Sequence, residues 1–60
     1  MQLTHVEINE KRLYTLLREL NSGKDIDMIE MEKLCKSLNF RLNSVTTESG
    51  HRIYGLVEND

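Results

Sequence analysis

Residues 40–57 read FRLNSVTTESGHRIYGLV and carry the clearest β-hairpin pattern in the chain. Ser49 and Gly50 make a turn dipeptide, because glycine readily adopts the positive φ that tight hairpin loops require. A two-residue loop at this point places Leu42 opposite Val57. A three-residue loop is the alternative, and it would shift one strand by one residue relative to the other.

The two-residue loop is preferred because it collects most of the apolar residues of both strands on one face. That inward face would contain Phe40, Leu42, Ile53 and Val57. It would also oppose Ser44 to Gly55, two small residues that let a helix approach the sheet closely. The outward face would still carry three adjacent apolar side chains, which are Val45, Tyr54 and Leu56.

Two amphipathic helices are predicted before the hairpin, over residues 10–20 and 28–38. Each repeats apolar residues at i, i+3, i+4 and i+7, the spacing of one buried stripe. The two stripes are Leu13, Leu16, Leu17 and Leu20 in the first helix, and Met31, Leu34, Cys35 and Leu38 in the second. Gly23 is suited to end the first helix and Asn39 the second, whereas Asp27 and Glu30 form a capping-box pattern between them.

Residues 2–8, QLTHVEI, fit either a strand or a helix. A helix would use Thr4 and Glu7 as a capping box, but it would place Ile8 far from the Leu13 stripe. The β-branched content and the need for a third strand favour a strand. We therefore predict a strand, followed by a helix cap at Asn9.

The predicted fold is a small α+β domain that covers residues 1–60 and has the order β-α-α-β-β. Two antiparallel helices would pack on one face of a two- or three-stranded antiparallel sheet. A chain of 60 residues is close to the lower size limit for an independent core. Proteins of this size often gain stability by self-association, so a homodimer or other homo-oligomer is expected.

Composition indicates the compartment and argues against several kinds of site. The single cysteine, Cys35, cannot form an internal disulfide and fits a reducing compartment. With His5 and His51 it supplies too few soft ligands for an ordinary zinc site, and no cofactor is predicted. No apolar run reaches the roughly 20 residues of a membrane span, and no signal-peptide pattern is present. We therefore expect a cytoplasmic protein.

The formal net charge of −2 does not suggest a general nucleic-acid binder. The charge is nevertheless uneven, because residues 1–32 carry four basic and seven acidic side chains, whereas residues 33–57 carry four basic and one acidic. A nucleic-acid-binding regulator is therefore the alternative function, and it would use the second helix and the hairpin. Its contact residues would be Lys33, Lys36, Arg41, His51 and Arg52.

Residues 34–54, LCKSLNFRLNSVTTESGHRIY, resemble the helix-to-strand segment of HicA-type mRNA interferases. That family has a Gly-Ser-His turn before a strand with an aromatic residue. The resemblance implies RNA cleavage, with His51 as general acid or base and Arg52 near the phosphate. Here the order is Ser49-Gly50-His51, and the first 30 residues have no counterpart. We do not assign the chain to that family, and we interpret His51 as an exposed turn residue.

No catalytic motif is found elsewhere, so the protein is not expected to be an enzyme. The glycines are too far apart for a phosphate-binding loop, and Cys35 lies in an apolar stripe. The predicted function is a small protein-binding regulator or inhibitor, of a bacterial or phage protein. Its binding residues would be Val45, Tyr54 and Leu56, with Arg41 and Arg52 at the rim.

Overall fold

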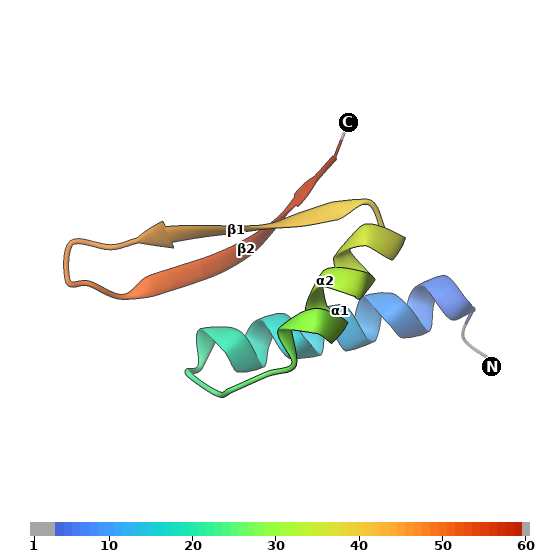
Figure 1. Ribbon diagram of the computed structural model, residues 1–60, viewed down its shortest axis with the longest axis horizontal. Helices are drawn as coiled ribbons and strands as arrows, with labels where there is room; N and C mark the ends of the chain where they lie inside the picture. Colours follow the sequence, from blue (N-terminus) through green and yellow to red (C-terminus); the bar gives the residue numbers. More distant parts are fainter. Residues whose placement is uncertain (1–3, 60) are drawn as a thin grey trace.

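The computed structural model describes residues 4–59, which form two helices followed by a hairpin. The elements are α1 (His5–Asn21), α2 (Met28–Ser37), β1 (Phe40–Thr46) and β2 (Arg52–Glu58). The strands form a two-stranded antiparallel sheet. Figure 1 shows both helices on one side of the hairpin, running in roughly opposite directions. The prediction of a small α+β domain with two helices and an antiparallel hairpin is confirmed.

The strand predicted over residues 2–8 is wrong where the structure describes it, because residues 5–8 belong to α1. Thr4 is the N-cap residue and forms a reciprocal capping box with Glu7. The Glu7 N–H donates to Thr4 Oγ1 over 3.1 Å, and the Thr4 N–H donates to Glu7 Oε1 over 3.3 Å. These bonds satisfy two backbone N–H groups at the start of the helix that have no partner within the helix. Ile8, whose position argued against a helix, is left 48% exposed. Residues 2 and 3 of that strand lie outside the described residues.

The core lies between the two helices and the inner face of the hairpin. Its buried side chains are Leu13, Leu16, Met31 and Cys35. Partly buried apolar residues surround them, namely Leu17, Ile26, Leu34, Leu38, Phe40, Leu42 and Leu56. The whole second stripe and the first stripe except Leu20 therefore belong to the core. Neither helix in the described part of the chain has the length and apolar character needed to cross a membrane.

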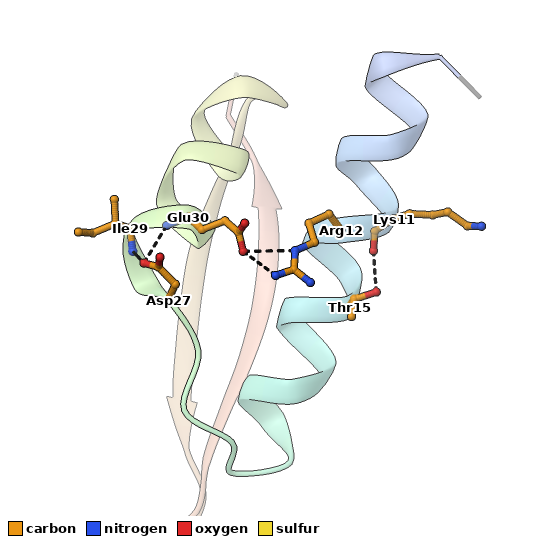
Figure 2. Close-up of polar contacts among 6 residues, drawn as sticks. All are labelled: Lys11, Arg12, Thr15, Asp27, Ile29 and Glu30. Carbon is orange, nitrogen blue, oxygen red and sulfur yellow. Dashed lines mark hydrogen bonds and ion pairs between the residues drawn. The ribbon is translucent and has the colours of Figure 1, made fainter. Parts of the chain in front are cut away.

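The helix ends follow the sequence signals with one difference. Gly23 and Asn39 have φ values of 87° and 62°, as expected after the last helical turn. At the start of α2, Asp27 Oδ1 accepts hydrogen bonds from the N–H groups of Ile29 and Glu30 (Figure 2). The Glu30 side chain does not complete a capping box. It reaches across to α1 and pairs with Arg12 over 2.8 Å (Figure 2).

The predicted hairpin register is wrong by one residue. Phe40 pairs with Glu58, Leu42 with Leu56, and Thr46 with Arg52. The loop consists of residues 48–50, the three-residue alternative, and is closed by hydrogen bonds of 2.7 and 2.9 Å that involve Thr47. Gly50 takes a φ of 87°, which is the left-handed position that ends such a loop.

This register changes the composition of both faces of the hairpin. Phe40, Leu42 and Leu56 pack on the core, whereas Ile53 is left 54% exposed. Ser44 now opposes Tyr54, and Gly55 opposes Asn43. The expected pair of small inward residues, Ser44 and Gly55, is therefore divided between the two faces.

Candidate functional site

The face of the hairpin opposite the helices has no cover among residues 4–59, and we call it the bare face (Figure 1). Three cross-strand pairs make it up: Arg41 with Val57, Asn43 with Gly55, and Val45 with Ile53. Val45 is 61% exposed and Ile53 is 54% exposed. Arg41 is its one charged residue. The bare face is therefore mainly apolar and neutral, with its charge at one end.

The residues predicted to bind a partner do not share one face. Val45 and Arg41 lie on the bare face, as predicted. Tyr54 and Leu56 alternate with its residues and point to the helix side, where Leu56 packs against the core. Arg52 also belongs to the helix-side set, at the loop end of β2. The predicted apolar cluster of Val45, Tyr54 and Leu56 is therefore wrong as a common surface.

Sequence reasoning missed Ile53, Gly55 and Val57 as bare-face residues. All three enter this face once the loop has three residues instead of two. The usable signal was Gly50 as the last of three loop residues, because a three-residue hairpin loop places glycine at that position. Both loop lengths were compatible with the Ser49-Gly50 pair.

Gly55 leaves a recess in the middle of the bare face. Its φ is not in the left-handed region, and a Cβ placed on it would meet no atom of residues 4–59 within 4 Å. Neither backbone strain nor packing inside the chain therefore requires a glycine here. A glycine inside a strand often marks a place where another backbone or ligand comes close. A second molecule that lies close to the strand at this point would account for the glycine.

The outer edge of β2 is closed by a side chain from the end of α1. The Tyr54 N–H donates to Asn21 Oδ1 over 2.8 Å, and Asn21 Nδ2 donates to the Tyr54 carbonyl over 3.0 Å. The Asn21 amide thus pairs with β2 much as a neighbouring strand residue would. This contact also anchors α1 to the hairpin.

The basic residues of the nucleic-acid alternative are divided between two places. Lys33, Lys36 and Arg41 line one groove between α2 and β1. His51 and Arg52 lie at the loop end of the hairpin, where His51 takes part in loop closure through its backbone. The five residues therefore do not form one continuous basic surface.

The single cysteine of the chain does not lie at the surface. Cys35 is buried, and burial together with the nearby Glu32 carboxylate raises the pKa of its thiol, which keeps it protonated. Across the same residues, no cluster of three or more histidine, cysteine or acidic side chains could hold a metal ion. Comparison of the chain with protein-family models, curated proteins and solved structures finds no match.

Proposed function

We propose that the protein is a small, non-enzymatic binding module of a regulatory or inhibitory kind, and that it pairs with a second copy through the bare face. The observation that carries this proposal is the exposed Val45–Ile53 pair beside the open space at Gly55. Apolar sheet surfaces that no part of the chain covers commonly mark protein interfaces. The single buried Cys35 fits a cytoplasmic setting, where thiols stay reduced.

The small core supports self-association. Within residues 4–59, four apolar side chains are buried, namely Leu13, Leu16, Met31 and Cys35. A domain of this size buries a smaller fraction of its surface on folding than a larger domain does and has little stability to spare. Packing one bare face against another would bury the exposed Val45 and Ile53 side chains and extend the core.

The shape of the bare face suits stacking of two sheets. Sheets that pack face to face lie about 10 Å apart and interdigitate their side chains. Gly55 supplies a recess between the Val45–Ile53 pair and Val57 into which an opposing side chain can fit. Arg41 lies at the end of this face, where its guanidinium can remain in water.

The test compares two variants that replace an exposed isoleucine by aspartate. Ile53→Asp places a charge in the apolar part of the proposed interface, so we expect it to convert a dimer into a monomer. Ile29→Asp is the matched control, because Ile29 is 66% exposed but lies on α2 and away from the bare face. Sedimentation velocity would measure both masses, and circular dichroism would show that both variants are folded. A wild-type chain that stays monomeric at high concentration would refute the self-association.

A second test uses Gly55→Val, which adds bulk to the recess without straining the monomer. We expect this variant to be folded and at least as stable as the wild type, because valine favours strands more than glycine does. It should nevertheless associate more weakly. A dimer of unchanged strength would show that the recess lies outside the interface.

The nucleic-acid alternative is supported by fewer residues of the structure. Lys33, Lys36 and Arg41 share a groove, and that group is too small for the clustered basic excess of a general binder. It predicts binding of RNA or DNA with a steep salt dependence. Titration with a labelled oligonucleotide at low salt would test it directly.

A further inference from the structure

Hydrogen bonds at the two ends of the hairpin show which backbone groups of β1 point away from β2. The Thr47 N–H donates to the His51 carbonyl at the loop end, and the Asn59 N–H donates to the Asn39 carbonyl at the other end. In an antiparallel pair, such positions alternate with positions whose N–H and C=O groups point outward. The outward groups of β1 therefore belong to Phe40, Leu42, Ser44 and Thr46.

The two edges of the sheet differ in how they are covered. Asn21 occupies the edge of β2 at Tyr54 with two hydrogen bonds, and α1 packs beside that strand. Within residues 4–59, no comparable contact closes the edge of β1. An unpaired edge of this kind can accept a strand from another molecule. β1 is therefore the edge at which strand addition can occur.

A groove of about 570 Å³ lies beside β1 and is bounded on its other side by α2. Figure 2 shows Ile29 at this helix, on the side that faces away from α1. The apolar residues that line the groove are Ile29, Met31, Cys35, Phe40 and Leu42. Phe40 and Leu42 also carry outward backbone groups, so the hydrogen-bonding edge and the apolar groove adjoin each other. A strand added here would place alternate side chains in the groove.

The charges around the groove indicate which strand it would accept. Glu32, Lys33, Lys36 and Arg41 line it, so basic groups are in excess. A second copy related by a two-fold axis would bring the same surface opposite itself, basic against basic. A segment with acidic side chains would meet opposite charges instead. The groove therefore favours an acidic partner over a copy of this chain.

We propose that the edge of β1 binds an extended segment of another protein, in which apolar and acidic residues alternate, by adding it as a third strand. The segment's backbone would pair with the outward groups of β1, and its apolar side chains would enter the groove beside Ile29 and Phe40. Its carboxylates would point to the other face of the sheet, where Arg41 of β1 lies beside the added strand. This mode of recognition takes affinity from main-chain hydrogen bonds and specificity from alternate side chains. It goes beyond self-association and uses a different surface from the bare face.

The first test uses synthetic peptides and the unmodified chain. The probe is a fluorescent, end-blocked peptide of about eight residues in which valine alternates with glutamate, a length that matches one strand. Fluorescence anisotropy at low ionic strength should show binding, and replacement of glutamate by lysine should weaken it by about tenfold. N-methylation of one alternate set of amides should abolish binding, whereas N-methylation of the other set should leave it intact. Valine amides are the sensitive set for an antiparallel strand, and glutamate amides for a parallel one.

The second test changes the protein. Arg41→Glu should weaken binding of the valine–glutamate peptide by about fivefold, while Lys24→Glu, outside the groove, should leave it unchanged. Ser44→Pro removes one outward N–H and keeps the bonds of β1 to β2, so it should reduce peptide binding while the hairpin persists. Ile53→Asp should not affect peptide binding, which separates this site from the proposed dimer interface.

Four outcomes would overturn the proposal. Equal binding of the glutamate and lysine peptides would remove the charge argument, and tolerance of N-methylation at both sets of amides would rule out strand addition. A labelled oligouridylate that binds in a Lys36-dependent manner, with no peptide binding, would make the groove a nucleic-acid site. Conversion of a dimer to a monomer by Lys36→Glu would assign the groove to a second copy instead.

Discussion

The two faces of the hairpin have similar apolar content but different surroundings. The helix-side face carries Phe40, Leu42, Tyr54 and Leu56, and three of these pack against the core. The bare face carries Val45, Ile53 and Val57, of which Val45 and Ile53 remain mostly exposed. Hydrophobicity alone therefore does not determine which face the helices cover.

The loop determines it instead. Residues 48–50 form a three-residue loop, and Gly50 takes the left-handed conformation that this loop requires. A loop shorter by one residue would replace Tyr54 and Leu56 on the helix side by Ile53 and Val57. A single residue of register thus decides which apolar side chains support the fold and which remain available to a partner.

The largest expected effect on stability comes from a pair of aspartate variants, one on each face of the hairpin. Leu42→Asp puts a carboxylate against the core, and we expect a loss of about 3 kcal/mol in unfolding free energy. That is more than half of the total of about 5 kcal/mol typical of a small domain, so the variant should unfold at a much lower temperature than the wild type. Val45→Asp, on the bare face, should leave the fold intact. Circular dichroism of both variants is the measurement, and equal unfolding would contradict the assigned faces.

The second prediction contrasts two glycines of the hairpin. Gly50→Val forces a β-branched residue to a φ of 87°, which should cost about 1–2 kcal/mol. Gly55→Val meets open space and ordinary strand geometry, so the monomer should not lose stability. Urea denaturation of the two variants, under conditions that keep both monomeric, would compare them. A harmless substitution at Gly50 would mean that the loop does not fix the register.

The helices could be predicted from sequence, whereas the hairpin register could not. The apolar stripes that contain Leu13 and Met31 can be buried in only one orientation of each helix. The capping residues at the helix ends are consistent with these helices. In the hairpin, two loop lengths each left apolar residues on both faces, and the choice that clustered Ile53 inward was wrong. At Thr4, a local capping box outweighed the β-branched content that favoured a strand.

The candidate site was predicted less well than the helices, because its residues depend on the hairpin register. An outward apolar surface was expected and is present, with Val45 and Arg41 among its residues. A one-residue shift replaced its other members, because successive strand residues point to opposite faces. The groove beside α2 had no sequence signal, since it depends on how the helix lies against the edge of β1.

The third prediction concerns the contact that holds the covered side together. Asn21→Ala removes both hydrogen bonds to the edge of β2, and we expect the free energy of unfolding to fall by about 1.5 kcal/mol. The matched control is Asn43→Ala, which removes the same amide from the bare face. Amide hydrogen exchange should also become faster at Tyr54 in the first variant and not in the second. Unchanged exchange at Tyr54 would show that Asn21 does not close that edge.

A smaller effect is expected at the start of α1. Thr4→Ala removes the side-chain acceptor of the capping box, which should cost about 1 kcal/mol and fray the first turn. Thr15→Ala is the control, because it lies inside the helix, where alanine is favourable. Secondary chemical shifts of residues 5–8 would report the fraying. Strand-like shifts there in the wild type would contradict the helix itself.

The smallest effect is expected at the ion pair that joins the two helices over the covered face. Arg12 and Glu30 lie 2.8 Å apart, but their side chains are 50% and 41% exposed, so water and salt screen the attraction. A double-mutant cycle with Arg12→Ala and Glu30→Ala should give a coupling of about 0.5 kcal/mol at low salt. The coupling should decline further at high ionic strength. A coupling several times larger that resists salt would contradict this prediction. It would mean that the ion pair, more than the apolar core, fixes the angle between α2 and β1, and that this angle sets the width of the groove.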